Sequence, residues 1–189
     1  MFNIVLMNKD INPWKTLSSE KIYENAWIRL DEHQVINPGG GRGIYGEVHF
    51  KNLAIGIIPL DENNNTWLVG QYRYPLKKYS WEIPEGGCPE GTDPLASAKR
   101  ELLEETGITA NSWTEIQRIY LSNSVSDELA IIYLAQELNF GESAPEESEE
   151  LSVKKIPFKI ALQMVMNGEI TDSISVAAIL KLQLINMRS

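Results

Sequence analysis

A continuous apolar run at residues 53–60 constrains the fold of this 189-residue chain more than any other feature. It contains no polar side chain, which is typical of a strand that is buried inside a sheet. Residues 61–65, an acidic pair followed by three asparagines, predict a turn, and residues 66–74 are expected to form the next strand. The chain is therefore expected to build its core on a sheet that contains a buried strand and its neighbour.

The rest of the chain mixes strand and helix patterns. Alternating segments on either side of a Pro/Gly turn at 37–41 predict a hairpin within residues 20–50. Further strands are expected at 81–83, running into a glycine loop, and at 113–121, 128–138 and 151–156. Helices are expected at 94–105, 158–166 and 173–186. This mixture predicts an α/β fold in which a mixed sheet lies between helical layers.

Composition excludes several classes of protein. With 43% hydrophobic and 23% charged residues, the chain is expected to be soluble and globular. Its apolar stretches are shorter than the roughly 18 to 20 residues that span a bilayer, so no membrane association is expected. The net charge of −9, with no basic stripe, argues against nucleic-acid binding. Residues 1–7 lack a basic segment and a cleavage site, so a cytoplasmic location is predicted.

The few cysteine and histidine residues limit the kind of metal site. Cys88 is the single cysteine, and His33 and His49 stand far apart in the sequence. This pattern fits neither an internal disulfide nor a zinc site built from Cys or His. A metal bound to this chain is therefore expected to have oxygen ligands.

The helix expected at 94–105 has clear boundary signals. Asp93 suits the N-cap, Pro94 the first helical position, and Gly107 the left-handed residue beyond the end. At 100° per residue, three apolar side chains share the face that we expect to be buried: Leu95, Ala98 and Leu102.

A different face of this helix carries Glu101, Glu104 and Glu105, together with Ser97. Carboxylates so close repel one another by about a few tenths of a kcal/mol per pair, and the helix dipole disfavours them near the C-terminus. Two interpretations follow from these residues. The face is either solvated, or it holds a hard divalent cation that cancels the repulsion.

Residues 86–108 resemble the Nudix box. The box is written G-x5-E-x7-R-E-U-x-E-E-x-G-U, with U a bulky aliphatic residue, and the chain reads GGCPEGTDPLASAKRELLEETGI. The positions in register are Gly86, Arg100, Glu101, Leu102, Glu104, Glu105, Gly107 and Ile108. Thr92 stands where the family has its first glutamate, which supports the box arginine or an additional metal. Because Thr92 replaces this glutamate, the resemblance does not fix the number of bound metal ions or full activity.

Three other stretches, at 71–73, 81–86 and 168–173, look like the ADP-ribose pyrophosphatase branch of this family. The resemblance implies the Nudix fold at 51–189 and an N-terminal antiparallel β arm at 1–50 that helps to build a homodimer and contact substrate. It also implies a small-molecule substrate, ADP-ribose or another nucleoside diphosphate sugar, which is split into a nucleoside monophosphate and a sugar phosphate.

The resemblance further implies Mg²⁺ or Mn²⁺ as cofactor. Its ligands would be Glu101 and Glu105 first, then Glu104 and the backbone carbonyl of Glu85. Glu147, in the acidic loop, would be the general base, and Glu149 a further ligand. The catalytic set is thus Glu101, Glu105 and Glu147. Gly86, Arg100 and Gly107 would have structural roles, with Arg100 orienting the loop and the glutamates.

Substrate contacts are implied for two groups of residues. Arg73 and Glu82 match family positions that contact phosphate and ribose or base, although Arg73 could equally pair with a strand neighbour. Glu128 follows a polar loop that approaches the terminal sugar in relatives. Trp27 and Arg29, in the arm, could stack a base, or Trp27 could serve packing.

Two alternatives to ADP-ribose hydrolysis remain open. The substrate could be another nucleotide sugar such as GDP-mannose, because base selection depends on arm residues. The chain could also be a catalytically weak nucleotide-binding module, since Thr92 replaces a box glutamate. Retention of Glu101, Glu104 and Glu105 favours catalysis.

Overall fold

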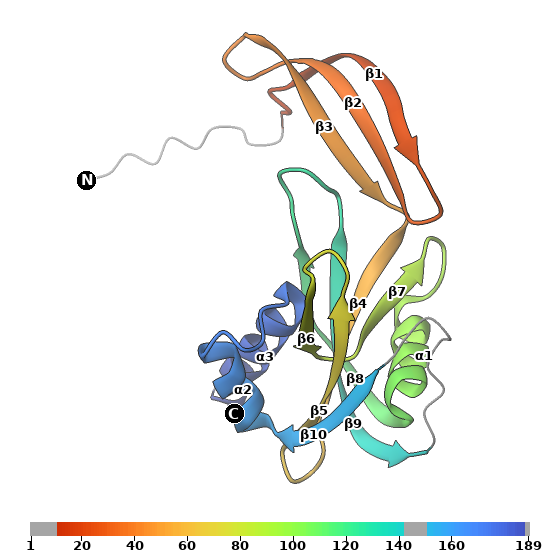
Figure 1. Cartoon of the computed structure of the whole chain (residues 1–189), viewed down its shortest axis with the longest axis vertical. Coiled ribbons are helices and arrows are strands. Elements are labelled where there is room, and N and C mark those ends of the chain that lie inside the picture. Colours follow the sequence, from red (N-terminus) through yellow and green to blue (C-terminus); the bar gives the residue numbers. More distant parts are fainter. Residues whose placement is uncertain (1–10, 142–150, 188–189) are drawn as a thin grey trace, which may run out of the picture. The chain divides into compact units, whose positions relative to one another are not determined.

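A computed structural model describes residues 11–141 and 151–187 of the chain (Figure 1). Its residues form two compact units. Among the described residues, one comprises 11–51 together with 122–127, and the other comprises 52–121, 128–141 and 151–187. The polar segment at 122–127 thus belongs with the N-terminal residues, although the chain reaches it through the larger unit.

The smaller unit is a three-stranded antiparallel sheet in the order β1(Lys15–Glu24), β2(Ile28–Ile36) and β3(Arg42–Phe50). The hairpin expected within 20–50 is present as β2 and β3, joined by a turn in which Asn37 bonds to Gly41. The sequence pattern did not predict where β1 begins. This strand is exposed along its length, and its pairing with β2 slips in register twice, so it lacks a simple two-residue alternation.

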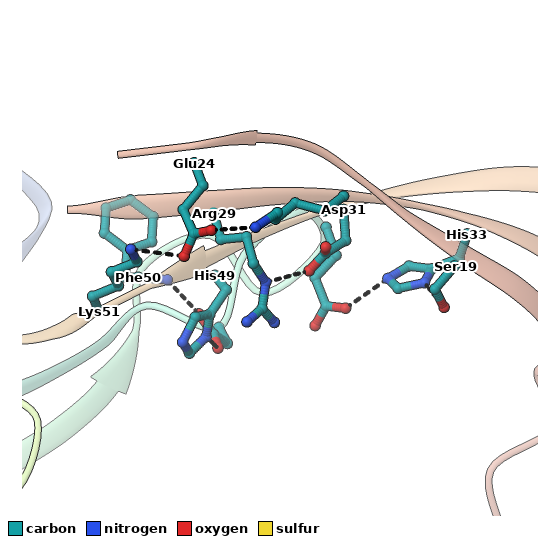
Figure 2. A network of polar contacts seen from close by, with 11 residues as sticks. Ser19, Glu24, Arg29, Asp31, His33, His49, Phe50 and Lys51 are labelled. Atoms are coloured by element: carbon teal, nitrogen blue, oxygen red, sulfur yellow. Dashed lines mark hydrogen bonds and ion pairs between the residues drawn. The ribbon is translucent and has the colours of Figure 1, made fainter. Parts of the chain in front are cut away.

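One face of this sheet carries a network of polar contacts (Figure 2). His33 lies between Ser19 and Glu47, with its Nδ1 2.8 Å from the serine hydroxyl and its Nε2 2.9 Å from the carboxylate. His49 pairs with Asp127, which brings the 122–127 segment against β3. Both histidines are therefore strand residues with partners inside this unit.

The larger unit contains two sheets. The four-stranded sheet has the order β7(Glu85–Pro89), β4(Asn52–Pro59), β9(Leu129–Phe140) and β8(Ile108–Tyr120). The β4–β9 pair is parallel and the other two pairs are antiparallel, which confirms the expected mixed sheet. The second sheet is antiparallel throughout, in the order β10(Ser152–Pro157), β5(Asn65–Arg73) and β6(Lys78–Glu82).

Alternating side chains of β4 face two apolar clusters on opposite sides of the sheet. Ile55 and Ile57 pack toward α1(Pro94–Thr106), whereas Ile58 packs toward α2(Phe158–Met166) and α3(Ser173–Asn186). Figure 1 shows α1 on one side of this sheet and α2 and α3 on the other. The sheet therefore lies between helices, as the sequence predicted. Over residues 11–141 and 151–187, no helix is long and apolar enough to cross a membrane.

Several strand boundaries differ from the sequence prediction. The expected glycine loop is partly strand, because Gly86 and Gly87 pair with Ile55 and Ala54 in β4. Strand β8 begins at Ile108 rather than 113, and β9 continues to residue 140, since the two pair over their whole length. A register shift between Glu115 and Gln117 interrupts the alternation of β8 inside the part that was expected as strand.

Candidate active site

Helix α1 carries the acidic side chains of the candidate site, and its ends are fixed as the sequence predicted. The Asp93 side chain accepts the N–H groups of Leu95 and Ala96 at 3.3 and 3.2 Å. At the other end, Gly107 has φ +71°, a left-handed conformation that favours glycine, and its N–H donates to the Leu103 carbonyl at 2.8 Å. Both caps fix the position of the last turn, where the glutamates lie.

The buried face of α1 includes more than the predicted apolar side chains. Ala98 and Leu102 are fully buried, and Leu95 is partly buried. Glu105, predicted on the polar face, is only 3% exposed, while Glu101 and Glu104 are intermediate. Burial raises the pKa of Glu101, an effect that the adjacent Arg100 opposes. These carboxylates are therefore not on a freely solvated face.

Arg100 connects the carboxylates to the glycine segment that precedes the helix. Its Nη1 donates to Glu104 at 2.7 Å, and its Nη2 donates to Glu101 at 2.6 Å and to the Gly87 carbonyl at 3.0 Å. One guanidinium thus fixes two glutamates and the backbone of β7 at the same time. This is the geometry expected of an arginine that orients the loop and the glutamates.

Gly86 lies directly against the carboxylate of Glu101. A Cβ atom added at Gly86 would sit far inside van der Waals contact with the carboxyl carbon and both oxygens. Glycine at this position therefore lets the β7 backbone approach a side chain of α1 closely.

The backbone of Glu85 meets Glu105, whereas the side chain of Glu85 meets α3. The Glu85 N–H donates to Glu105 Oε2 at 3.1 Å, and Ser175 Oγ donates to Glu85 Oε1 at 2.8 Å. Burial, together with the neighbouring Asp172 carboxylate, raises the pKa of Glu85 well above its usual range and favours the neutral acid. The Glu85 side chain is thus engaged by α3, and the Glu85 backbone is the part that the resemblance predicts as a cation ligand.

Arg73 and Glu82, both predicted to contact substrate, form an ion pair across β5 and β6. Arg73 Nε donates to both oxygens of Glu82 at 3.0 Å, and Nη2 contacts the same carboxylate. Glu82 is buried, whereas the Arg73 side chain is 37% exposed. The structure thus shows the strand-neighbour pairing that sequence analysis left open for Arg73, and it leaves part of the Arg73 side chain accessible.

The other predicted site residues belong to other elements of the chain. Glu128 is a partly buried residue immediately before β9. Trp27 and Arg29 belong to the smaller unit, where Trp27 is 67% exposed and Arg29 pairs with Asp31 at 2.7 Å. Glu147 and Glu149 fall outside the described residues.

Thr92, which replaces a box glutamate, closes the turn before α1. Its hydroxyl donates to the Pro89 carbonyl and lies 3.2 Å from the buried Cys88 sulfur. The residue therefore has a local role at the start of the helix, next to the cap residue Asp93.

Sequence analysis missed two residues that contact the site, Asp172 and Ser175. Both lie at the start of α3, where Asp172 is the N-cap and accepts the Ser175 N–H at 2.8 Å. An Asp preceding a helix is an ordinary capping signal. Nothing in the local sequence pattern indicates that the Ser175 hydroxyl, 90 positions further along the chain, reaches Glu85.

The oxygen atoms gathered here suit a hard cation. Mg²⁺ characteristically takes one or two carboxylates and completes its coordination with water and substrate phosphates. Among the described residues, no three His, Cys, Asp or Glu side chains are grouped so that they alone could hold a metal ion. Glu101 and Glu105, with the backbone of Glu85, are the candidate ligands among the described residues.

Comparison with known families matches this arrangement. The family model for the NUDIX domain matches residues 50–169, and the model for the nucleoside diphosphate sugar hydrolase N-terminal domain matches residues 14–48. The chain belongs to the Nudix family, and it is a pyrophosphohydrolase.

Individual relatives cover most of the chain. It is 34% identical to the ADP-ribose pyrophosphatase of Mycobacterium tuberculosis over 88% of this chain and 82% of that protein. It is 33% identical to the ADP-ribose pyrophosphatase of Bacillus subtilis over 90% of this chain and 92% of that protein. A crystal structure of an ADP compounds hydrolase shares the fold, with a TM-score of 0.84 at 19% identity over 95% of this chain and 97% of that one.

Proposed function

We propose that this protein hydrolyses the pyrophosphate bond of ADP-ribose or a related nucleoside diphosphate sugar, giving a nucleoside monophosphate and a sugar phosphate. The observation that carries the proposal is the contact of the buried Glu105 carboxylate with the Glu85 backbone, beside Glu101 and Gly86. The names of the two bacterial relatives support this substrate class.

The proposed cofactor is Mg²⁺ or Mn²⁺, held by Glu101, Glu105 and the Glu85 carbonyl, with Glu104 and Glu149 as further candidates. When bound, such a cation neutralises phosphate charge and lowers the pKa of a water ligand. The chain's own residues prepare the site for it. Arg100 fixes the orientation of Glu101 and Glu104, and burial of Glu105 keeps its carboxylate in one position.

Proton removal from the attacking water is assigned to Glu147. This residue lies outside the described structure, so the proposal rests on its position in the acidic loop that precedes β10. The variant Glu147→Gln tests it directly: turnover should fall strongly while metal affinity stays near that of the wild type. Loss of metal affinity would instead assign Glu147 a ligand role.

Binding of the diphosphate is assigned to Arg73. Glu82 holds the Arg73 guanidinium by up to three contacts, and the exposed remainder can donate to phosphate oxygens. Contacts to the sugar and base are assigned to Glu82, Glu128, Trp27 and Arg29.

We further propose that the smaller unit mediates homodimer formation. Its sheet exposes large apolar side chains, including Ile22, Tyr23 and Ile44, each more than half exposed. Light scattering coupled to gel filtration tests this proposal. A mass near twice the chain's 21.3 kDa would support it, and a mass near 21.3 kDa at micromolar concentration would refute it.

Two alternatives stay testable beside this function. The preferred substrate could be another nucleotide sugar such as GDP-mannose, or Thr92 could mark a chain that binds nucleotides with little catalysis. A panel of nucleoside diphosphate compounds with Mg²⁺, assayed for nucleoside monophosphate and sugar phosphate, separates them. Fastest turnover of ADP-ribose supports the proposal. Binding without turnover of any member of the panel would favour the binding module.

A further inference from the structure

Helix α3 contacts the segment that precedes the Nudix box through one buried hydroxyl. Ser175 is 0% exposed, and its Oγ accepts the Ile83 N–H at 2.9 Å and donates to Glu85 Oε1 at 2.8 Å. A serine hydroxyl has one proton to donate. Here that proton is directed at the Glu85 carboxyl, while a lone pair of the same oxygen accepts the backbone N–H of Ile83.

Residues of α1 and β4 also bond to the segment that Ser175 contacts, residues 83–85. The Glu85 N–H donates to Glu105 Oε2 at 3.1 Å, and the Pro84 carbonyl accepts the Ile57 N–H at 2.9 Å. Residues 83–85 are thus fixed by a strand, by the carboxylate of a candidate ligand, and by Ser175. Ser175 comes from a part of the chain far beyond the box, as does Asp172, whose carboxylate also interacts with the Glu85 side chain.

Ser175 is itself held firmly. Its backbone N–H donates to Asp172 Oδ2 at 2.8 Å, so it belongs to the capped first turn of α3. The adjacent Ile174 packs so closely on Gly56 of β4 that a Cβ atom at Gly56 would collide with it. The hydroxyl therefore has little freedom to follow a shift of the segment, and it can act as a fixed reference point for residues 83–85.

We propose that Ser175 is a positioning residue that sets the backbone of Glu85 against the Glu105 carboxylate, and that metal affinity depends on it. The proposal rests on the function proposed above only in assigning a divalent cation to these oxygens. Ser175 contacts the segment and not the cation, so its effect passes through Glu85.

The consequence of removing the hydroxyl follows from the same contacts. In Ser175→Ala, the buried Ile83 N–H and the partly buried Glu85 carboxyl both lose a partner, and an unpaired buried N–H is costly. The segment then relaxes toward other partners, and the Glu85 backbone moves relative to Glu105. Metal affinity should fall, while the substrate contacts assigned to Arg73 should be largely kept.

Binding of Mn²⁺, followed by electron paramagnetic resonance, tests the proposal without requiring turnover. We expect Ser175→Ala to weaken Mn²⁺ binding at least about tenfold and to raise the Mg²⁺ concentration for half-maximal turnover in parallel. The KM for ADP-ribose at saturating metal should change less than about threefold. Ser173→Ala, an exposed serine in the same helical turn, is the matched control and should behave as the wild type.

A purely structural role would lower the melting temperature of Ser175→Ala and leave its Mn²⁺ affinity unchanged, and that result would overturn the proposal. If Ser175→Ala does not fold, Ser175→Cys keeps the shape of the side chain, with a larger atom that is a weaker hydrogen-bonding group, and should show the same loss of affinity. If the wild type hydrolyses no member of the substrate panel and Ser175→Ala still binds Mn²⁺ more weakly than the wild type, the proposed function is refuted but the role of Ser175 is not. If Ser175→Ala has the turnover and the Mn²⁺ affinity of the wild type, the role of Ser175 is refuted and the proposed function is not.

Discussion

The contact between Gly86 and Glu101 makes Gly86→Ala a sharp test of the site. A methyl group at this position would overlap the Glu101 carboxylate on all three of its atoms. Ordinary non-bonded separations are about 3.5 Å, so the carboxylate must retreat by more than about 1 Å. A displacement of that size in a catalytic group can cost about 100-fold in rate, equivalent to roughly 2.7 kcal/mol of transition-state stabilisation.

Fold stability should respond very differently. The colliding atoms are the far end of a flexible side chain, and Gly86 is not among the glycines with positive φ. Replacing glycine by alanine in an accessible backbone conformation also restricts the unfolded chain, which stabilises by about 0.4 to 1 kcal/mol. We therefore expect Gly86→Ala to change the free energy of unfolding by less than about 1 kcal/mol.

The assay is the Mg²⁺ dependence of ADP-ribose hydrolysis, measured together with thermal unfolding. Gly87→Ala is the matched control, because its added Cβ would meet Asn52 at 3.1 Å and none of the candidate ligands. We expect a loss of turnover and a higher Mg²⁺ requirement in Gly86→Ala alone. Wild-type turnover and Mg²⁺ dependence in a folded Gly86→Ala would refute the assignment of Glu101.

Three further outcomes follow from single side chains. Glu105→Gln should lower kcat at least about 100-fold and change KM less than about threefold, because it removes charge at the metal rather than at the base or ribose. Steady-state kinetics measure both constants, and a kcat equal to that of the wild type would contradict this expectation. Thr92→Glu should keep or improve turnover. It should be about 1 kcal/mol less stable, because the hydrogen bond from the Thr92 hydroxyl to the Pro89 carbonyl is lost. A sharp loss of turnover in a folded variant would show that this hydroxyl serves catalysis. Although burial opposes the shift, hydrogen bonds from Asn65 and the ion pair with Lys155 lower the pKa of Asp61 from 3.8 to about 2. That lowered pKa stabilises the fold above about pH 4 and ceases to do so as pH falls toward 2, so Asp61→Asn should be about 1 kcal/mol less stable at pH 7 and show no deficit near pH 2 in denaturant titrations.

The elements that sequence analysis predicted well are those with strong local signals. Helix α1 was expected at 94–105 and spans Pro94–Thr106, because Asp93 and Gly107 fix its ends by local hydrogen bonds. The buried strand at 53–60 was found because both of its faces are apolar. The start of β1 was not predicted because its register slips and its exposure remove the alternating pattern.

The contacts within the candidate site depend on tertiary structure, which local patterns do not encode. The helical spacing brought Glu101, Glu104 and Glu105 together on one face, yet it did not indicate that Glu105 is buried. Ser175 lies 90 positions from Glu85, and only the packing of α3 on β4 brings them together.

Measuring metal binding by the box carboxylates is the most direct test of their assignment as ligands of the catalytic cation. Titration of Mn²⁺ into the wild type and Glu105→Gln, with a non-hydrolysable ADP-ribose analogue present, can be followed by electron paramagnetic resonance. We expect the wild type to bind Mn²⁺ in the presence of the analogue and the variant to bind it at least about tenfold more weakly. Equal affinity in the two proteins, or no binding by the wild type, would contradict the assignment of these glutamates as metal ligands.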